Sequence, residues 1–400
     1  MKRTHTGATA MSASVAAAAA AAPTIGTHSG SFQADEALGC ALLRMTEAYA
    51  ESPITRSRDP AVLATKDIVI DVGGVYDPSV RRYDHHQRGF FETFDGPAGE
   101  AKPGTGKFKV RSAPPLLIVA AVASSRPSHR RGRRIAPPSP ALPCPAHPTP
   151  PPTRPHPQTP LSASGLVYKH FGCAIIARLH GTDAADTALL HAKVYSDMME
   201  GIDGIDSGVE QCETKPRYRE GTGLSARVAR MNPRWNEEST DADLDARFAA
   251  AVEVAGADFR AVLEKAALSW LPARGVVTAA IAARESVDPS GEVVLFASGG
   301  VPWRDHVYDL EREAGVEGLV KFVLYPDQSG MWRVQAVTVE GAAFTNRISL
   351  PEAWCGVRGD DLTKVSGIAG CCFAHANGFI GGNETQAGAL AMALAAIKGV

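Results

Sequence analysis

The chain has 400 residues, 44% of them hydrophobic and 21% charged, which allows two folded domains, and no apolar run approaches the ~20 residues of a membrane span. Its seven cysteines are odd in number and have no repeated spacing, which argues against a disulfide framework or a zinc finger and favours a reducing, intracellular compartment. The net charge of the chain is −2. Residues 101–160 contain ten Lys or Arg and no acid, so the remaining residues together carry a net charge of −12. That charge balance argues against broad, nonspecific coating of nucleic acid, although bound metal ions would still let an acidic enzyme handle phosphates.

Residues 1–23 are expected to form a disordered leader. The first 34 residues contain no acid, and seven consecutive alanines, 16–22, precede Pro23. A Ser-rich, acid-poor composition is typical of an organelle transit peptide. However, this leader is poor in Arg, and Ala-rich disordered leaders with no targeting function are common. Both interpretations stay open on composition.

The first predicted catalytic elements are a short strand and a helix that follow the leader. The strand ends near His28, a glycine-containing loop turns, and the apolar spacing of residues 37–43 predicts a helix that begins at Asp35. Acids favour a helix N-terminus, so Asp35 is either a cap or a ligand.

A second strand and an unusual tripeptide come next. Residues 67–74 read as a buried strand that ends in Asp71, and soon afterwards the chain reads Asp84-His85-His86. Imidazoles and carboxylates are the mixed ligands of ions such as manganese, and pairs of such ions hydrolyse phosphate esters. Two solvated histidines in a loop are the plain alternative. Acids at the ends of successive strands meet in one crevice of an open α/β sheet, which favours a site.

Residues 101–160 form a Pro- and Arg-rich insert that we expect to be disordered. Half of residues 137–160 are proline, which prevents a helix or a central strand. The run Arg130 to Arg134 is a weak match to a basic nuclear-localisation signal. The favoured interpretation is that it belongs to a solvated low-complexity segment.

Helical patterning resumes at Leu161 and continues through residues 174–179 and 184–199. It leads to Asp203 and Asp206, which lie among glycines as a turn or a further ligand site. A long amphipathic stretch, 244–270, then ends at Pro272 and is predicted to bridge to a second domain.

The second domain is expected to cover residues 271–400. Residues 291–296, 321–325 and 331–337 read as strands, the last two as a hairpin. Near the C-terminus a glycine-containing stretch, 378–383, precedes an Ala/Leu-rich helix over 385–397. Glycines that open a helix can hold a phosphate at its N-terminus, or they simply form a packing turn.

Taken together, these residues resemble the DHH phosphoesterase superfamily, and specifically the MYG1 (melanocyte proliferating gene 1, UPF0160) exonuclease family. The resemblance covers roughly 24–100 and 161–398. It rests on several phrases in one order: Gly26-Thr27-His28, Asp35-Glu36-Ala37-Leu38, Asp71-Val72-Gly73-Gly74, Tyr83 to Arg88, Leu224 to Arg230, and Gly378 to Gly382.

The resemblance implies an α/β fold with two domains. The catalytic domain, 24–100 and 161–270, would hold a parallel sheet with helices on both faces, and a smaller α+β domain would close on the substrate. The implied activity is a 3′-to-5′ exonuclease on single-stranded RNA in mitochondria and nucleus, without membrane attachment, in which two Mn²⁺ ions, or Mg²⁺, activate water.

By the same resemblance, each site residue has an implied role. Asp84 would orient and polarise a histidine, and His85 would contact the scissile phosphate or assist the leaving oxygen. The implied metal ligands are His28, Asp35, Asp71, His86, Asp206 and Asp203. The substrate-binding candidates are Arg88, Arg227, Arg230, Gly381, Gly382 and Asn383.

Two departures from the family qualify this prediction. Gln33 stands where the family has a histidine, and an amide cannot replace an imidazole as a ligand or base. The family also lacks the 101–160 segment, for which we hypothesise an intron retained in frame. The alternatives are therefore a small-molecule phosphatase or pyrophosphatase, or a catalytically impaired RNA-binding member. Oligomeric state is left undetermined.

Overall fold

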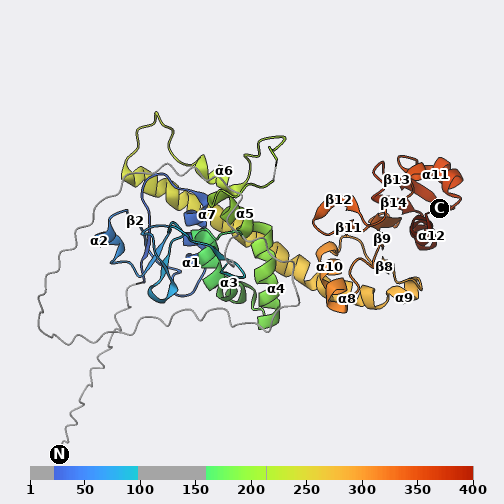
Figure 1. Ribbon diagram of the computed structural model, residues 1–400, viewed down its shortest axis with the longest axis horizontal. Helices are drawn as coiled ribbons and strands as arrows, with labels where there is room; N and C mark the ends of the chain where they lie inside the picture. Colours follow the sequence, from blue (N-terminus) through green and yellow to red (C-terminus); the bar gives the residue numbers. More distant parts are fainter. Residues whose placement is uncertain (1–21, 98–158, 213, 400) are drawn as a thin grey trace, which may run out of the picture.

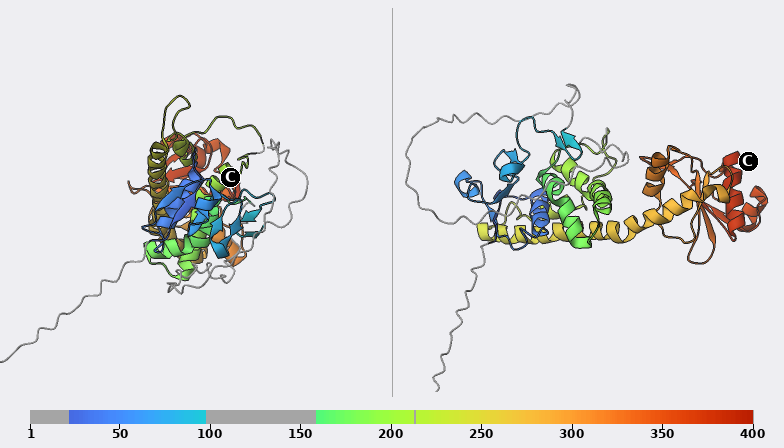
Figure 2. Two further views of the ribbon diagram at one scale, coloured as in Figure 1. Left: turned by 90° about the vertical axis from the view of Figure 1, so that its left-hand side faces the viewer. Right: turned by 90° about the horizontal axis from the view of Figure 1, so that it is seen from below.

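Two five-stranded sheets organise the chain, one in each half, and a long helix runs between them (Figures 1 and 2). The computed structural model describes residues 22–97, 159–212 and 214–399. The predicted leader up to residue 21 and the insert from 98 to 158 lie outside these described residues. Within them, no helix is both long and apolar enough to cross a bilayer.

The first sheet has the order β2-β1-β3-β5-β4, parallel except for its last pair. Its central strands β1 and β3 are fully buried, as expected for apolar runs covered on both faces. Parallel strands bring their C-terminal ends to one edge, so the residues that follow β1, β3 and β5 lie together. The strands are β1 (Ile25–Thr27), β2 (Ile54–Arg56), β3 (Ile68–Ile70), β4 (Tyr76–Asp77) and β5 (Arg82–Tyr83), with a separate hairpin of β6 (Glu92–Thr93) and β7 (Gly96–Pro97).

Helices complete the first domain. Helix α1 packs against β3, α3 and α7, and its buried residues run without interruption from Ala34 to Leu43. The remaining elements here are α2 (Pro60–Leu63), η1 (Pro78–Val80), α3 (Ala163–His180), α4 (Ala184–Val194), the π-helical turn η2 (Tyr195–Met199), α5 (Glu200–Asp206) and α6 (Leu224–Ala229), beside α1 (Ala34–Arg44). The predicted helices at Asp35 and over 184–199 are thereby confirmed.

The β6–β7 hairpin lies against the start of α3. The backbone N–H of Leu161 donates to the carbonyl of Glu92, at 2.9 Å. Lys169 on α3 reinforces this contact, since its ammonium group lies 2.6 Å from both the Glu92 carboxylate and the Thr93 carbonyl. The β6–β7 hairpin is thus fastened to the start of α3.

The helix predicted to end at Pro272 continues through it, so that expectation is wrong. Helix α7 (Asp241–Lys265) passes into a π-helical turn, η3 (Ala266–Trp270), and then into α8 (Leu271–Ala282). A proline lacks an N–H and its ring crowds the carbonyl four residues earlier. The wider π turn occupies those positions, which lets the chain keep its direction.

The second domain has a mixed sheet of order β13-β14-β10-β9-β8, in which only β8 and β9 are parallel. The predicted strands at 291–296, 321–325 and 331–337 are present as β8, β9 and β10, and α12 packs against β9, β10 and β14. The elements are α9 (Arg284–Val287), β8 (Val293–Leu295), α10 (Arg304–Ala314), β9 (Phe322–Pro326), β10 (Trp332–Ala336), β11 (Thr338–Val339), β12 (Ala342–Asn346), η4 (Glu352–Trp354), α11 (Gly359–Ser366), β13 (Cys371–Ala374), β14 (Ile380–Asn383) and α12 (Gln386–Lys398).

The glycine-containing stretch before the last helix is a strand and not a loop. Gly381 and Gly382 belong to β14 and pair with both β10 and β13. A Cβ on Gly382 would lie 2.6 Å from a guanidinium nitrogen of Arg333, so close packing accounts for this glycine. These two glycines therefore lie in a strand before α12, and their part in holding a phosphate stays a prediction.

Candidate metal centre

The site lies where β1, β3 and β5 end, and its backbone is unusual at β3. Asp71 has a φ of 56°, in the left-handed region that few residues other than glycine adopt, and Gly73 and Gly74 follow with φ values of 105° and 68°. Such strain persists only where the surroundings hold it. The turn brings the Asp71 carboxylate back over the strand ends.

The first cluster consists of His28, Glu36 and Asp71, all buried. The Nε2 atom of His28 lies 2.9 Å from Oε1 of Glu36 and 3.3 Å from Oδ2 of Asp71. Glu36 is placed by the first turn of α1, where its Oε1 also accepts the backbone N–H of Gln33, at 2.8 Å. Burial opposes a charge on His28, but its hydrogen bonds to Asp71 and Glu36 outweigh burial and raise its pKa to about 10.

The other ring nitrogen of His28 has two neighbours. Its Nδ1 lies 3.2 Å from the Ser29 carbonyl and 3.2 Å from a guanidinium nitrogen of Arg58. If Nδ1 carries the proton, it donates to Ser29 and leaves Nε2 free as a ligand. Metal-binding histidines are usually oriented in this way, by a carbonyl on the second nitrogen.

The second cluster joins Asp71 to the predicted Asp84-His85-His86 tripeptide. Oδ1 of Asp71 lies 3.3 Å from Nε2 of His85 and 3.6 Å from Nδ1 of His86. Asp84 is buried, and its Oδ1 accepts from Nδ1 of His86 at 2.7 Å while Oδ2 accepts the N–H of Gly74. Asp84 therefore ties the glycine turn to a histidine. The His86 side chain is 62% exposed, whereas that of His85 is 10% exposed.

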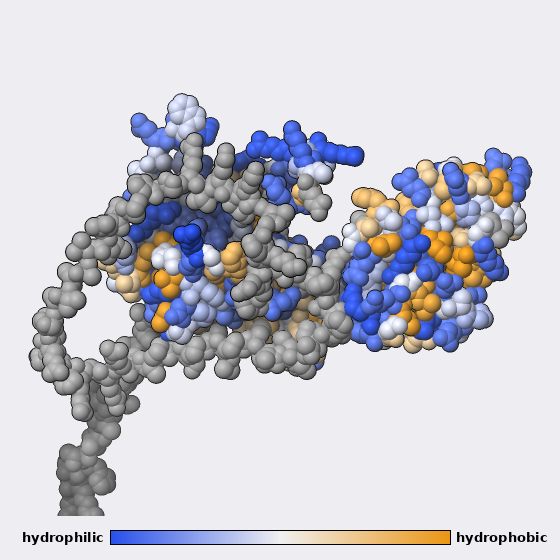
Figure 3. All heavy atoms as spheres, in the orientation of Figure 1, coloured by the Kyte–Doolittle hydropathy of each residue, from blue (hydrophilic) through white to orange (hydrophobic). Residues whose placement is uncertain are grey.

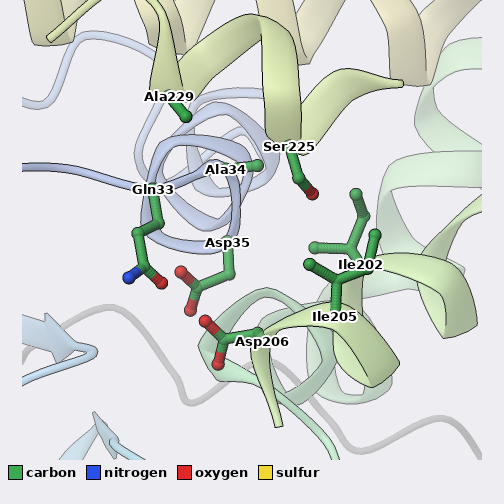
Figure 4. Close-up of a pocket in the computed structure, with 8 residues that line it drawn as sticks. All are labelled: Gln33, Ala34, Asp35, Ile202, Ile205, Asp206, Ser225 and Ala229. Carbon is green, nitrogen blue, oxygen red and sulfur yellow. The ribbon is translucent and has the colours of Figure 1, made fainter. Parts of the chain in front are cut away.

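The third cluster contains Asp35, His85 and Asp206. Nε2 of His85 lies 3.2 Å from Oδ2 of Asp206, which comes from the last turn of α5. Figure 4 shows the carboxylates of Asp35 and Asp206 turned toward each other with the Gln33 amide beside them. These groups border a cavity of about 290 Å³, whose opposite wall is formed by Ser225 and Ala229 of α6.

A second cavity, of about 310 Å³, opens on the other side of the clusters and shares Gln33 and Asp206 with the first. Arg58 is the only arginine or lysine lining it among the described residues. A guanidinium there can pair with phosphate oxygens.

The carboxylates of these clusters are buried close to one another, an arrangement that a bound cation would stabilise. Burial, with repulsion from Asp71 and Glu36, raises the pKa of Asp35 far above its usual range. Burial raises that of Asp206 to about 6 despite the opposing charge of His85. Burial would also raise the pKa of Asp71, but the nearby His28 and His85 side chains, each 3.3 Å from its carboxylate, lower it.

Several polar atoms of this centre have no hydrogen-bond partner among the described residues. They are both carboxylate oxygens of Asp35, Oε2 of Glu36, Oδ1 of Asp71 and Nε2 of His85. Unpartnered buried acceptors are costly, and a bound divalent ion would satisfy them. This donor set of imidazoles and carboxylates suits ions such as Mn²⁺ and Mg²⁺.

The structure gathers five of the six predicted ligands, His28, Asp35, Asp71, His86 and Asp206, into these clusters. Asp203 belongs to none of them. It is fully buried one turn before Asp206, where its Oδ1 accepts from the N–H and the hydroxyl of Ser162, at 3.0 and 2.8 Å. Asp203 therefore fastens α5 to the start of α3.

The predicted substrate-binding residues are dispersed. Arg88 is exposed beside the tripeptide, Arg227 pairs with Asp258 at 2.5 Å, and Arg230 donates to the Gly221 carbonyl at 2.7 Å. Asn383 is fully buried in the second domain, where its side chain accepts the N–H of Thr385 and donates to the Ala369 carbonyl. The structure does not bring Asn383, Gly381 or Gly382 to the clusters.

Two residues of the centre were not predicted from the sequence. Glu36 looked like one of two acids in a helix first turn, and only the fold shows that it faces His28. Arg58 follows β2, and no motif marked it. Arg58 could have been found by the argument that identified Asp71. It follows the end of β2, which is parallel to β1, so it lies at the same edge of the sheet.

Comparisons with known proteins agree with this architecture. Residues 24–105 and 151–397 match the MYG1 exonuclease family model, described as an uncharacterised protein family, UPF0160. MYG1 exonuclease of Homo sapiens is 42% identical over 380 residues, which cover 94% of this chain and 86% of the relative. The MYG1 protein of Dictyostelium discoideum is 39% identical over 373 residues, covering 93% and 95%. No solved structure matches. By this agreement along nearly its whole length, the chain belongs to the MYG1 exonuclease family.

Proposed function

We propose that this protein is a metal-dependent phosphodiesterase that removes nucleotides from the 3′ end of single-stranded RNA. The observation that carries the proposal is the convergence of Asp35, Asp71 and Asp206 with His28 and His85 around buried acceptors that have no partner among the described residues. Relatives named as exonucleases support a nucleic-acid substrate. The 3′-to-5′ direction, the preference for RNA and the use of Mn²⁺ over Mg²⁺ are parts of the proposal.

Two ions would be held by two ligand sets that share Asp71. One set is His28, Glu36 and Asp71, and the other is Asp35, His85 and Asp206 with Asp71 beside it. Bound there, a pair of divalent ions would lower the pKa of water and stabilise the charge on phosphate oxygens. This arrangement assigns His85 to the ligands and leaves His86 for the substrate, the reverse of the roles that the family resemblance implies.

The remaining side chains would position the reaction. Asp84 fixes the ring of His86 and raises its pKa, because it accepts a hydrogen bond from Nδ1. His86 is exposed at the second cavity, where its ring can donate a hydrogen bond to a phosphate or to the leaving oxygen. Arg58 lines the same cavity and would neutralise a phosphate charge.

A nuclease assay tests the proposal. A 5′-labelled single-stranded RNA should be shortened from its 3′ end with Mn²⁺ and remain intact with a chelator. Asp71→Asn keeps a residue type that tolerates the left-handed backbone, so it should fold normally and lose more than about 100-fold in rate. Asp360→Asn, at an exposed position on α11, is the matched control. Release of phosphate from pyrophosphate without RNA shortening would instead favour a small-molecule phosphatase.

Gln33 supports one alternative, an impaired member that binds RNA without cleaving it. Its amide borders both cavities in the position where the family carries a histidine. If the chain binds RNA but cleaves it only after Gln33→His, this alternative replaces the proposal.

The proposed location is the mitochondrion and the nucleus. It rests on the acid-poor leader and on the family resemblance. A fluorescent protein fused to the C-terminus would report it, and removal of residues 1–23 should abolish a mitochondrial signal. If the fusion has the same location in the cell with and without residues 1–23, the leader is not a mitochondrial targeting sequence.

A further inference from the structure

The helix α6 forms one wall of the metal centre, and the chain on each side of it is exposed. Ser225 and Ala229 of α6 line the same cavity as Asp35 and Asp206. Figure 1 shows two loops rising from the body on either side of α6, and Figure 3 colours this region mostly hydrophilic. We call residues 215–235, which include α6 and parts of both loops, the α6 surface.

The α6 surface is anchored to the segment that leads into helix α1. Asn232 accepts the N–H of Phe32 at 2.9 Å and donates to the Phe32 carbonyl at 2.8 Å. Phe32 lies three residues before Asp35, so the loop that follows α6 is held beside the acidic cluster. Arg230 closes the surface by donating to the Gly221 carbonyl in the preceding loop.

The charge of the α6 surface is opposite to that of the protein as a whole. It contains six Lys or Arg and a single acid, Glu220, in a chain of net charge −2. Lys215, Arg217 and Arg219 are exposed and have no acidic partner among the described residues. A phosphodiester chain complements such a surface, because its charges repeat at each nucleotide.

Two aromatic side chains on this surface are held out in solvent. Trp235 is 96% exposed and Tyr218 is 79% exposed, one in each loop. Tyr and Trp are enriched where proteins contact other molecules, because each ring offers a large apolar face together with a polar group. Interleaved arginines and exposed aromatic rings are how proteins bind single strands, since every base offers a face for stacking.

We propose that the α6 surface binds the single-stranded part of the substrate, with bases stacked on Trp235 and Tyr218 and phosphates paired with Lys215, Arg217 and Arg219. The strand would then enter the cavity between α6 and the Asp35–Asp206 pair. This inference rests on the proposed nuclease function and adds to it the path of the polynucleotide. Duplex ends would bind more weakly, because paired bases cannot stack on the loops.

Trp235 provides its own reporter for the test. The chain has five tryptophans, and Trp270, Trp303 and Trp354 are buried while Trp332 is half-buried. In a chelator, which prevents cleavage, oligouridylate should quench the tryptophan fluorescence of the full chain. Trp235→Phe should abolish the quenching but retain binding, and Trp235→Ala should weaken binding roughly five- to hundredfold, the scale of one stacked base.

A charge variant tests the phosphate contacts separately. Replacing Lys215, Arg217 and Arg219 together by Ala should reduce the dependence of log affinity on log salt by about 2, since each contact to a single strand contributes about 0.7. Lys364→Ala, whose exposed side chain lies on α11 in the second domain, is the matched control and should bind as the unaltered chain does.

The inference is overturned if oligouridylate binds without quenching, if both variants bind within twofold of the unaltered chain, or if a blunt duplex binds equally well. These measurements report binding without cleavage, so their failure can be distinguished from failure of the nuclease assay. Hydrolysis of bis(p-nitrophenyl) phosphate with Mn²⁺ reports the metal centre alone, and it should be unchanged in the control Lys364→Ala. If Trp235→Ala loses this hydrolysis together with RNA binding, the loop supports the centre itself and the inference is overturned.

Discussion

Gly165 and Asp203 offer a sharp test of how the site is supported. Gly165 lies in the first turn of α3, and a Cβ placed on it would overlap both oxygens of the Asp203 carboxylate and lie 2.7 Å from its Cγ. The carboxylate cannot simply turn away, because it accepts the two hydrogen bonds from Ser162. Gly165→Ala should therefore push α5, and with it Asp206, away from α3.

The expected cost follows from opposing effects. Replacing Gly by Ala in a helix favours folding by up to about 1 kcal/mol. Overpacking costs about 1–3 kcal/mol, and each weakened hydrogen bond to a charged group costs about 1.5–3 kcal/mol. A net loss of about 2–4 kcal/mol is expected, which corresponds to a fall in Tm of roughly 5–15 °C for a domain of this size. RNA cleavage should fall as well, since Asp206 moves.

Gly201→Ala is the matched control, because Gly201 lies on α5 and a Cβ there would meet nothing within 4 Å. It should leave the Tm unchanged or raise it slightly. Thermal unfolding followed by circular dichroism compares the two variants. If both shift the Tm in the same direction by similar amounts, the overlap with Asp203 does not control the position of α5 and the reasoning fails.

The other predictions concern pH, metal affinity and the insert. Burial raises the pKa of Asp203 from 3.8 to about 7, so between these values the unfolded chain loses a proton that the folded chain keeps, and stability falls as pH rises. Asp203→Asn removes the titrating carboxyl group. Measured in a chelator, the free energy of unfolding of the variant minus that of the unaltered chain should therefore increase from pH 4 to pH 7. If this difference does not change with pH, the raised pKa of Asp203 is contradicted. Gln33→His should tighten Mn²⁺ binding by roughly tenfold in calorimetry, and equal affinities would show that this position does not reach the ion. Deleting residues 106–150, which lie outside the family match, should leave the Tm and Mn²⁺ affinity unchanged, and loss of folding would give the insert a structural role.

Much of the centre was predictable because parallel strands align their ends. His28 follows β1 and Asp71 follows β3, so strand recognition alone placed them together. Glu36 was not predictable, because two adjacent acids in a helix first turn point in different directions and the sequence does not show which one faces His28. Asp203 was predicted to be a ligand or part of a turn among glycines, but it lies in α5 one turn before Asp206 and its carboxylate accepts from Ser162 instead.

Other differences arise from packing that local patterns do not contain. The chain continues as a helix through Pro272 because a π turn comes immediately before it. Gly381 and Gly382 lie in a strand that pairs with β10 and β13, and neighbouring side chains crowd both positions, since a Cβ would lie 2.9 Å from Leu350 at the first and 2.6 Å from Arg333 at the second. In both cases a residue that usually interrupts regular structure is accommodated by its neighbours.

The hydrogen bond from Leu161 to Glu92 has a consequence for the length of this chain. Once those two points are joined, the segment between them is a closed loop, and the entropy lost on closing a loop grows only with the logarithm of its length. Each doubling costs about 0.6 kcal/mol. A gene can therefore gain or lose dozens of codons between β7 and α3 at a penalty comparable to one conservative core substitution, which makes this junction a place where length can vary during evolution without loss of the fold.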